Sequence, residues 1–240
     1  MGMLTTDGMI INEVKYGEGN KILTVLTPEY GKIQVGANGI RSFKSKNSAG
    51  CSLFGYSYFV LRERREIYSL SSAESINKFY NIQKDVEKIA IASYFCELLC
   101  NVTRQAMPAD GILKLALNTM FYLSKHNNYK HVKPVFELRL MLEAGLAPNV
   151  TSCTICQSQD NITRFSTKEG GVLCEICGKA DYITSCALTA MRYILSSCPK
   201  KIFSFAANDD VLFELSHLSE KYILSHLERM PKSLNFLREL

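Results

Sequence analysis

The run KILTVLT (Lys21–Thr27), the turn PEYG (Pro28–Gly31) and the run KIQVGA (Lys32–Ala37) decide the fold of the first part of the chain. β-Branched residues are frequent in the first run, and a proline and a glycine bound the turn that separates it from the second. This pattern predicts two antiparallel strands joined by a tight turn. A further strand is predicted over Met9–Lys15, so that the three strands would form a meander.

Two more strands complete the predicted N-terminal domain. They cover Tyr56–Arg62 and Glu66–Leu70, are joined across Glu63–Arg65, and follow a glycine-rich loop. Five short strands within roughly 70 residues favour a small closed barrel, and among barrels of that size the OB-fold is the best match. We therefore expect an OB-fold β-barrel over residues 1–78, a fold that can bind oligonucleotides.

Beyond residue 75 the apolar residues change from a period of two to the helical period of 3.6. Three helices are predicted before residue 150, the third ended by Gly145 and Pro148, and helical periodicity returns after residue 180. The sequence thus predicts an α+β multidomain protein in which an all-α domain, residues 79–150 and 181–240, follows the barrel. The positions that define the helical faces are Ile82, Val86, Ile89, Cys96, Cys100, Leu113, Leu117, Met120, Val135, Leu138, Leu142, Leu212, Leu215, Leu218 and Tyr222.

Four cysteines interrupt the helical pattern as two C-x2-C pairs, Cys153 with Cys156 and Cys174 with Cys177, separated by seventeen residues. Each pair can aim two thiolates at one point about 2.3 Å away, and two pairs complete the tetrahedron that zinc prefers. The spacing is typical of such sites. We expect an inserted four-cysteine zinc module over residues 151–180 that holds one Zn2+ ion. Because all four ligands would be protein thiolates, this ion would support folding and not catalysis.

Two other interpretations of these cysteines account less well for the spacing. Four unrelated buried thiols would need no paired arrangement. Dithiol redox chemistry uses a C-x-x-C motif that stands singly in a βαβ context, and this sequence lacks that context. The remaining cysteines show no partner pattern. Cys96 and Cys100 share the apolar face of a predicted helix and are expected to pack in the protein core.

Composition places the chain among globular proteins. It has 240 residues, of which 47% are hydrophobic and 21% charged, with nine cysteines and a formal net charge of +5. The N-terminal residues lack the basic and apolar regions of a signal peptide, and no apolar run approaches the ~18 residues of a membrane span. A reducing cytoplasm is the expected compartment, with no membrane partner, and paired cysteines there are interpreted first as metal ligands.

Basic residues gather in the predicted barrel domain, with few acidic residues between positions 30 and 62. Tyr30, Phe43, Tyr56 and Tyr58 lie among them, and a single strand needs cations for its phosphates and aromatic faces for its bases. A solvated basic surface explains the same residues equally well. The candidate DNA-binding residues are Lys21, Lys32, Arg41, Lys44, Lys46, Arg62, Arg64 and Arg65.

Motifs of the common enzyme classes are absent from the sequence. It contains no phosphate loop ending in Gly-Lys-Ser/Thr, no H-E-x-x-H and no G-x-S-x-G. Residues 226–228 spell the H-x-E fragment of deaminases, but they follow the cysteines, lack a P-C-x-x-C partner and lie in a helical pattern. We therefore predict a protein that catalyses no covalent reaction.

Two ordered groups of motifs extend over nearly the whole chain. The first is Tyr16-Gly17-Glu18, Lys21-Ile22-Leu23-Thr24, Leu26-Thr27, Tyr30-Gly31-Lys32, Gly39-Ile40-Arg41 and Lys44-Ser45. The second is Phe136-Glu137-Leu138-Arg139, Leu142 and Gly145-Leu146, running into Cys153 and Cys156. In this order and spacing they resemble the bacterial recombination mediator family RecO.

The resemblance implies an N-terminal OB-fold, a helical domain and an inserted zinc module in a nucleoid-associated bacterial protein of DNA repair and homologous recombination. It implies binding of single- and double-stranded DNA and annealing of complementary strands. It also implies cooperation with RecR to place RecA on strands coated by single-strand-binding protein (SSB). Some relatives lack the cysteines, which implies that zinc is not the core of the activity.

The resemblance also suggests site residues. Arg41, Lys44 and Lys46 match the basic loop of the family's first domain, so a DNA-contact role is carried onto them. Family members receive the acidic, hydrophobic SSB tail on the helical domain. Lys133 and Arg139 are the candidates for that contact, because a cation in an apolar groove suits a carboxylate-ended peptide.

A second class of protein fits the same residues. A zinc-ribbon adaptor would bind only other proteins, without DNA, and its basic loop would be a solvated surface. The two classes differ in one property, since an adaptor should show no salt-sensitive binding to an oligonucleotide.

Overall fold

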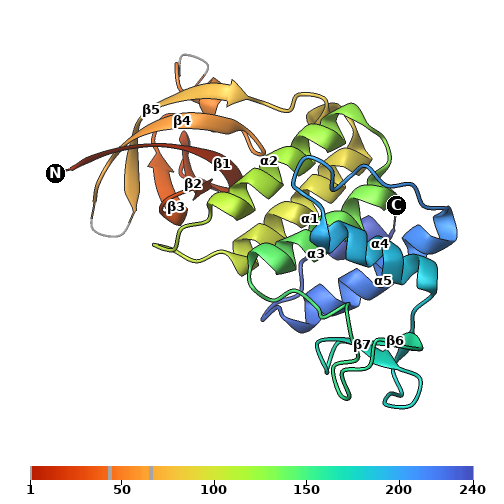
Figure 1. The fold of residues 1–240 in the computed structure, drawn as a ribbon. Coiled ribbons are helices and arrows are strands. Elements are labelled where there is room, and N and C mark those ends of the chain that lie inside the picture. The colour runs from red at the N-terminus through yellow and green to blue at the C-terminus, as the bar shows by residue number, and fades with distance from the viewer. Residues whose placement is uncertain (1, 43–44, 65–66, 240) are drawn as a thin grey trace. The chain divides into compact units, whose positions relative to one another are not determined.

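A computed structural model describes residues 2–42, 45–64 and 67–239 of the protein (Figure 1). The chain divides into two compact units, one formed by residues 1–127 with 231–240 and the other by residues 128–230. The predicted division into three domains at residues 78, 150 and 180 stays a prediction. The predicted fold class is confirmed, because a five-stranded barrel precedes helices that are interrupted by a cluster of four cysteines.

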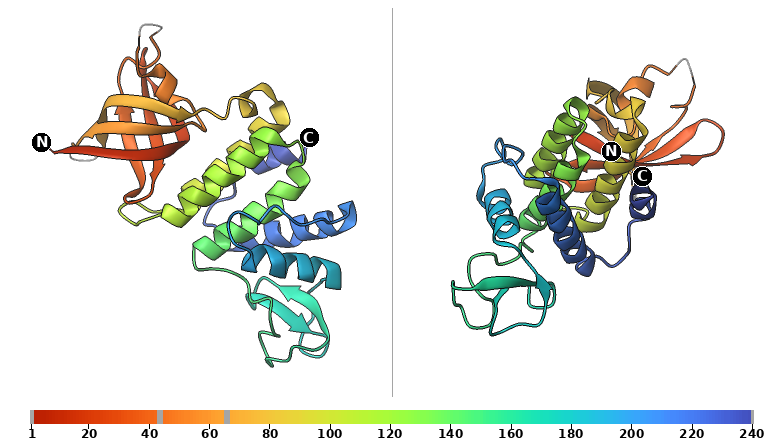
Figure 2. Two further views of the ribbon diagram at one scale, coloured as in Figure 1. Left: turned by 45° about the horizontal axis from the view of Figure 1, so that its top comes forward. Right: turned by 90° about the vertical axis from the view of Figure 1, so that its right-hand side faces the viewer.

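The first unit contains a closed barrel, seen most clearly in the left view of Figure 2. Its strands follow the order β1-β2-β3-β5-β4 around the barrel. Neighbouring strands are antiparallel except β3 and β5, whose parallel pairing closes the barrel. The strands are β1 (Met3–Tyr16), β2 (Asn20–Thr27), β3 (Gly31–Ala37), β4 (Tyr56–Arg62) and β5 (Tyr68–Asn77).

Side chains alternate across β4, and this alternation separates the barrel core from its outer surface. Ser57, Phe59 and Leu61 are buried, whereas Tyr58 and Arg62 are exposed on the outer face. The core also takes Leu23, Val25, Ile33 and Val35 from the predicted first hairpin. The hairpin prediction for β2 and β3 is therefore confirmed, and its hydrophobic residues fill the barrel.

The predicted C-terminal end of β5 is wrong. The sequence predicted a strand over Glu66–Leu70; Glu66 lies outside the described residues, and β5 runs from Tyr68 to Asn77. Ala73 is the one buried residue of this strand, while Ser72 and Glu74 are exposed. Ser71 and Ser75 share the inner face with Ala73, so the strand lacks the apolar residues at every second position by which a half-buried strand is predicted.

Helices follow the barrel in the first unit. They are α1 (Val86–Val102), α2 (Asp110–Lys125) and α6 (Ser233–Arg238), with the short 3-10 turns η1 (Ser48–Cys51) and η2 (Ile82–Lys84). The first helix was expected to include Ile82, but it begins after Asp85. The Asp85 carboxylate accepts hydrogen bonds from the backbone N–H groups of Glu87 and Lys88, which defines the N-terminus of α1.

The turn between β2 and β3 joins the barrel to the α1–α2 connection. The Ala109 N–H donates to the Pro28 carbonyl oxygen at 2.8 Å. Gly31 has a φ of +62°, and a Cβ atom there would meet the carbonyl oxygens of Arg104 and Met107. Glycine is needed at this position both for its conformation and for the close backbone approach.

The second unit contains three helices and a small sheet. The helices are α3 (Tyr129–Glu143), α4 (Ser185–Ser196) and α5 (Asp209–Ser225). The sheet has the order β7-β6-β8, from β6 (Ile162–Ser166), β7 (Gly171–Cys174) and β8 (Asp181–Tyr182). Every residue from His131 to Met141 is buried, so α3 is the central helix of this unit. Among the helices of the described ranges, none is long and apolar enough to cross a membrane.

Candidate metal centre and nucleic-acid interface

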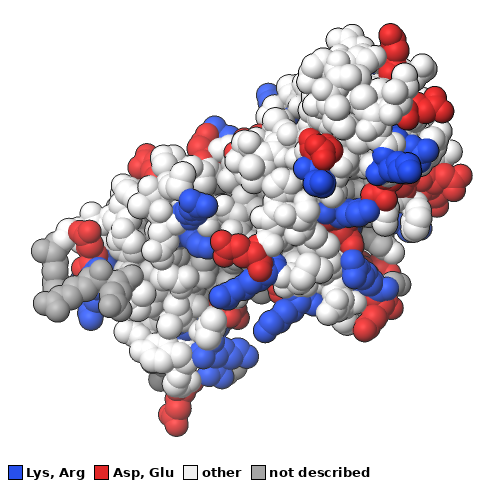
Figure 3. Space-filling model, turned by 90° about the horizontal axis from the view of Figure 1, so that it is seen from below, with Lys and Arg blue, Asp and Glu red and all other residues white. Residues whose placement is uncertain are grey.

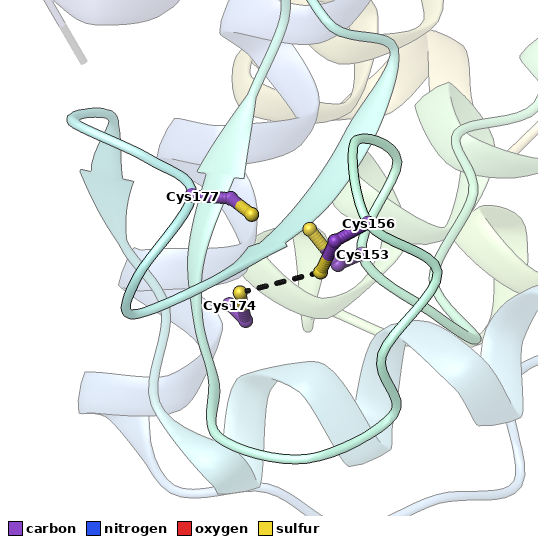
Figure 4. A group of neighbouring side chains, drawn as sticks. All are labelled: Cys153, Cys156, Cys174 and Cys177. Carbon is purple, nitrogen blue, oxygen red and sulfur yellow. Dashed lines mark hydrogen bonds between the residues drawn. The ribbon is translucent and has the colours of Figure 1, made fainter.

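The four predicted cysteines meet at one point (Figure 4). The sulfur atoms of Cys153, Cys156, Cys174 and Cys177 all lie within 4.8 Å of one another. The Sγ atoms of Cys156 and Cys174 are 3.7 Å apart. A tetrahedron with metal–sulfur bonds of about 2.3 Å has sulfur–sulfur edges of about 3.8 Å. The prediction that these residues form one cluster able to hold a metal ion is therefore confirmed.

Two tight turns position the sulfur atoms. Each C-x2-C pair forms a turn, and the turn at Cys174 follows directly on β7. A Cβ atom at Gly171 would meet the backbone of Asn149, and one at Gly178 would meet the side chain of Leu173. The glycines that flank the second pair therefore let β7 approach the backbone of Asn149 and let the chain after Cys177 fold back onto Leu173.

Local hydrogen bonds favour the thiolate form of one member of the cluster, Cys153. Burial opposes a charged Cys153 thiolate, but backbone N–H groups of Cys156, Cys174 and Ile155 outweigh it and lower the pKa of Cys153. In contrast, burial raises the pKa of Cys51 to about 12. Hydrogen bonds with the Cys156 and Cys174 side chains raise the pKa of Cys177 to about 12 in turn, so it is the convergence of four sulfur atoms that distinguishes the cluster from Cys51.

Contacts that sequence reasoning missed join α4 to the residue before the cysteine pairs, Val150, and to α5. The Arg192 guanidinium donates to the Val150 carbonyl oxygen at 2.7 Å. The backbone N–H and the hydroxyl of Thr184 both donate to the Glu214 carboxylate at 2.7 Å. These pairs are 30 or more residues apart in sequence, so no local pattern could have indicated them.

The predicted DNA-binding residues fall into different environments. Arg41 is exposed, and its guanidinium donates to the Glu18 carbonyl oxygen at 3.1 Å, which leaves its charge without a carboxylate partner among the described residues. Lys46, Arg62 and Arg64 are exposed and form no ion pair with another described residue. The predicted contacts Lys44 and Arg65 lie outside the described residues.

Lys21 and Lys32 are engaged within the first unit. The Lys21 ammonium lies 2.8 Å from the Glu13 carboxylate in a half-buried ion pair. The Lys32 ammonium donates to the Cys100 carbonyl oxygen at 2.5 Å, within the last turn of α1. A cation at the C-terminal end of a helix also interacts favourably with the helix dipole. A DNA contact from these two residues stays a prediction, and each would give up an internal interaction to make one.

The aromatic residues that were expected among the cations are poorly placed for bases. Tyr30 packs against the barrel core, and the Tyr56 hydroxyl donates to the Asp7 carboxylate. Tyr58 is exposed, but its cross-strand neighbours are Asp7 and Glu74, whose charges repel phosphates. Phe43 lies outside the described residues. On the face drawn in Figure 3, as far as it is described, basic and acidic side chains are interspersed without a broad area of one sign.

Lys133 and Arg139, the candidates for the SSB tail, are buried in α3. The Lys133 ammonium lies 2.9 Å from the carboxylates of both Glu137 and Glu220. The Arg139 guanidinium donates to the carbonyl oxygens of residues 194, 195 and 197 at the C-terminal end of α4, at 3.0 to 3.4 Å. A tail carboxylate would have to displace these contacts, so a role in tail binding stays a prediction.

In comparisons with known proteins, the N-terminal and the C-terminal part of the chain both match the same protein family. Residues 1–79 match the family model described as recombination protein O N terminal, and residues 83–235 match recombination protein O C terminal. The chain is 35% identical to the DNA repair protein RecO of Acetivibrio thermocellus, over 100% of this chain and 98% of the relative. It is 32% identical to that of Alkaliphilus metalliredigens, over 95% of each chain, and 31% identical to that of Caldicellulosiruptor bescii, over 99% of each.

Proposed function

This chain belongs to the RecO family of DNA repair and recombination proteins, and from that premise we propose that it is a mediator of homologous recombination without covalent catalysis. It binds single- and double-stranded DNA and anneals complementary strands. The observation that carries the proposal is the match of both family models, in order, over the barrel and the helices that follow it.

Annealing needs no reacting group. Two complementary strands repel each other through their phosphates, and a protein accelerates their pairing by screening that repulsion and holding the strands together. The exposed cations Arg41, Lys46, Arg62 and Arg64 of the barrel unit support this role. We propose them as phosphate contacts, together with Lys44 and Arg65.

The proposed partners follow from family membership. RecR and the SSB tail are the direct protein partners, and RecA is reached indirectly through them. The reducing cytoplasm is the proposed compartment, because a cluster of four thiolates needs reduced cysteines.

We propose that the metal is one Zn2+ ion held by Cys153, Cys156, Cys174 and Cys177. Four sulfur donors in a tetrahedral arrangement favour zinc over metals that prefer oxygen ligands. When bound, such an ion supplies folding free energy and leaves no coordination position for a substrate. The cysteine segment is thereby assigned to stability, and DNA binding to the barrel.

Replacing Arg41 and Lys44 with alanine tests the proposed DNA contacts. Each lost phosphate contact with a single strand should reduce the slope of log affinity against log salt by about 0.7, so the double variant should lose about 1.4. Fluorescence anisotropy with an oligonucleotide, titrated between about 50 and 200 mM salt, measures this slope. Lys114→Ala is the matched control, because Lys114 already pairs with Asp110 on α2.

Two results would contradict the proposal. An unchanged slope and affinity in the double variant would remove this loop from the DNA site. Absence of any salt-sensitive binding by the unaltered protein would favour the zinc-ribbon adaptor instead.

A further inference from the structure

The hairpin between β1 and β2 carries an exposed aromatic side chain that the sequence analysis did not select. Tyr16 is the last residue of β1 and pairs with Asn20 at the start of β2. Its side chain is 50% exposed, and that of Val14, two residues earlier on the same face of the strand, is 53% exposed. A tyrosine so exposed at the end of a hairpin contributes little to the barrel core.

The hairpin tip is held in one conformation by the segment that follows β3. The Gly39 N–H donates to the Asn20 side-chain oxygen at 2.9 Å, and the Arg41 N–H donates to the Gly19 carbonyl oxygen at 3.1 Å. Ile40, between these two donors, is buried in the barrel core and anchors the segment. The backbone around Tyr16 is therefore preorganised, which lowers the entropy lost when a ligand binds there.

The charges around Tyr16 favour a polyanion. Lys15 is exposed on the opposite face of β1, and the Arg41 guanidinium is bound to the carbonyl oxygen of Glu18 at 3.1 Å. Of the two nearby carboxylates, that of Glu13 is neutralised by its ion pair with Lys21, which leaves Glu18. The tip thus combines an aromatic face with an excess of positive charge. Tyr58, the exposed tyrosine of β4, differs in this respect because its cross-strand neighbours are acidic.

We propose that Tyr16 is a base-stacking residue for single-stranded nucleic acid. One unpaired base would lie on the phenol ring, while Arg41 attracts an adjoining phosphate. This inference rests on the proposed DNA-binding function and deepens it. Stacking requires a base that is free of its partner strand, so Tyr16 provides a preference for single strands that the cations alone do not give.

Replacing Tyr16 with alanine tests the stacking contact. The affinity for a single strand should fall by about 5- to 100-fold, because stacking of one base contributes that range of affinity. The salt slope and the affinity for a duplex should stay unchanged, since no phosphate contact is removed. Tyr16→Phe keeps the ring and should retain most of the affinity. The matched control is Tyr58→Ala, another exposed tyrosine of the same barrel, which should bind as the unaltered protein does.

An oligonucleotide with abasic sites separates stacking from a general loss of binding. It should bind the unaltered protein and Tyr16→Ala with equal, weakened affinity, because neither complex can stack a base. A single-strand affinity unaffected by Tyr16→Ala would overturn the inference, as would an equal loss on single strand, duplex and abasic strand. The proposed function survives either result. If the unaltered protein shows no salt-sensitive binding to any strand, the proposed function fails and this inference fails with it.

Discussion

Cys174→Ser is expected to release the bound zinc ion and to unfold the segment between Asn149 and Ile183. The hydrophobic cluster around the four sulfur atoms contains three buried residues, Cys153, Leu173 and Cys174. So small a core cannot stabilise some 30 residues alone. Structural zinc in small domains contributes binding free energies of about 10 to 16 kcal/mol, and a serine hydroxyl is a poor replacement for a thiolate.

Metal content and hydrogen exchange measure this effect together. The variant should retain no stoichiometric zinc, and exchange protection should be lost across residues 149–183 while it persists in the barrel. Cys186→Ser is the matched control, because Cys186 is an exposed cysteine outside the cluster. A variant that kept both zinc and protection would contradict the assigned ligands. Loss of DNA binding by a variant whose barrel remains folded would contradict the assignment of the zinc segment to stability.

Lys133→Met is expected to destabilise the second unit by about 3 to 5 kcal/mol, because it removes the ammonium that pairs with the buried Glu137 carboxylate and with the half-buried Glu220 carboxylate. Glu137 is 0% exposed, and it pairs with Lys133 one helical turn away. Burial lowers the pKa of Lys133, but Glu137 and Glu220 outweigh it and the pKa is raised. The ion pairs therefore contribute fully below the ordinary lysine pKa of about 10.4, and the contribution is lost as pH rises through the folded-state value.

Hydrogen exchange in α3 and denaturant unfolding at neutral pH measure the loss. Lys130→Met is the matched control, since Lys130 is exposed on the same helix. A loss no greater than that of the control would show that the buried charges are compensated in another way. If instead Lys133→Met stays as stable as the unaltered protein and loses SSB-tail binding, the role suggested by the resemblance is correct.

The sequence was sufficient to predict those features that depend on a local pattern of residues. β-Branched residues in Lys21–Thr27 and the turn Pro28–Gly31 predicted the barrel hairpin, and the two C-x2-C pairs predicted the sulfur cluster. Both depend on spacing along the chain, which sequence displays directly. The polar strand β5 failed because its residues after Leu70 are mostly serine, glutamate and asparagine.

The environment of each cation could not be predicted in the same way. Lys32 resembled a surface cation, yet its ammonium contacts the last turn of α1, 68 residues away. Lys133 resembled a docking residue, yet one of its two carboxylate partners, Glu220, lies on another helix. Such partners are fixed by tertiary packing, so a list of basic residues overestimates the number of cations available to DNA.

Annealing of complementary strands coated with SSB, measured with and without RecR, tests the central claim most directly. The protein should accelerate annealing without nucleotide hydrolysis, its effect should fall steeply as salt rises, and RecR should alter the rate through a shared complex. Annealing no faster than that of the coated strands alone, at low salt and with RecR present, would contradict the account.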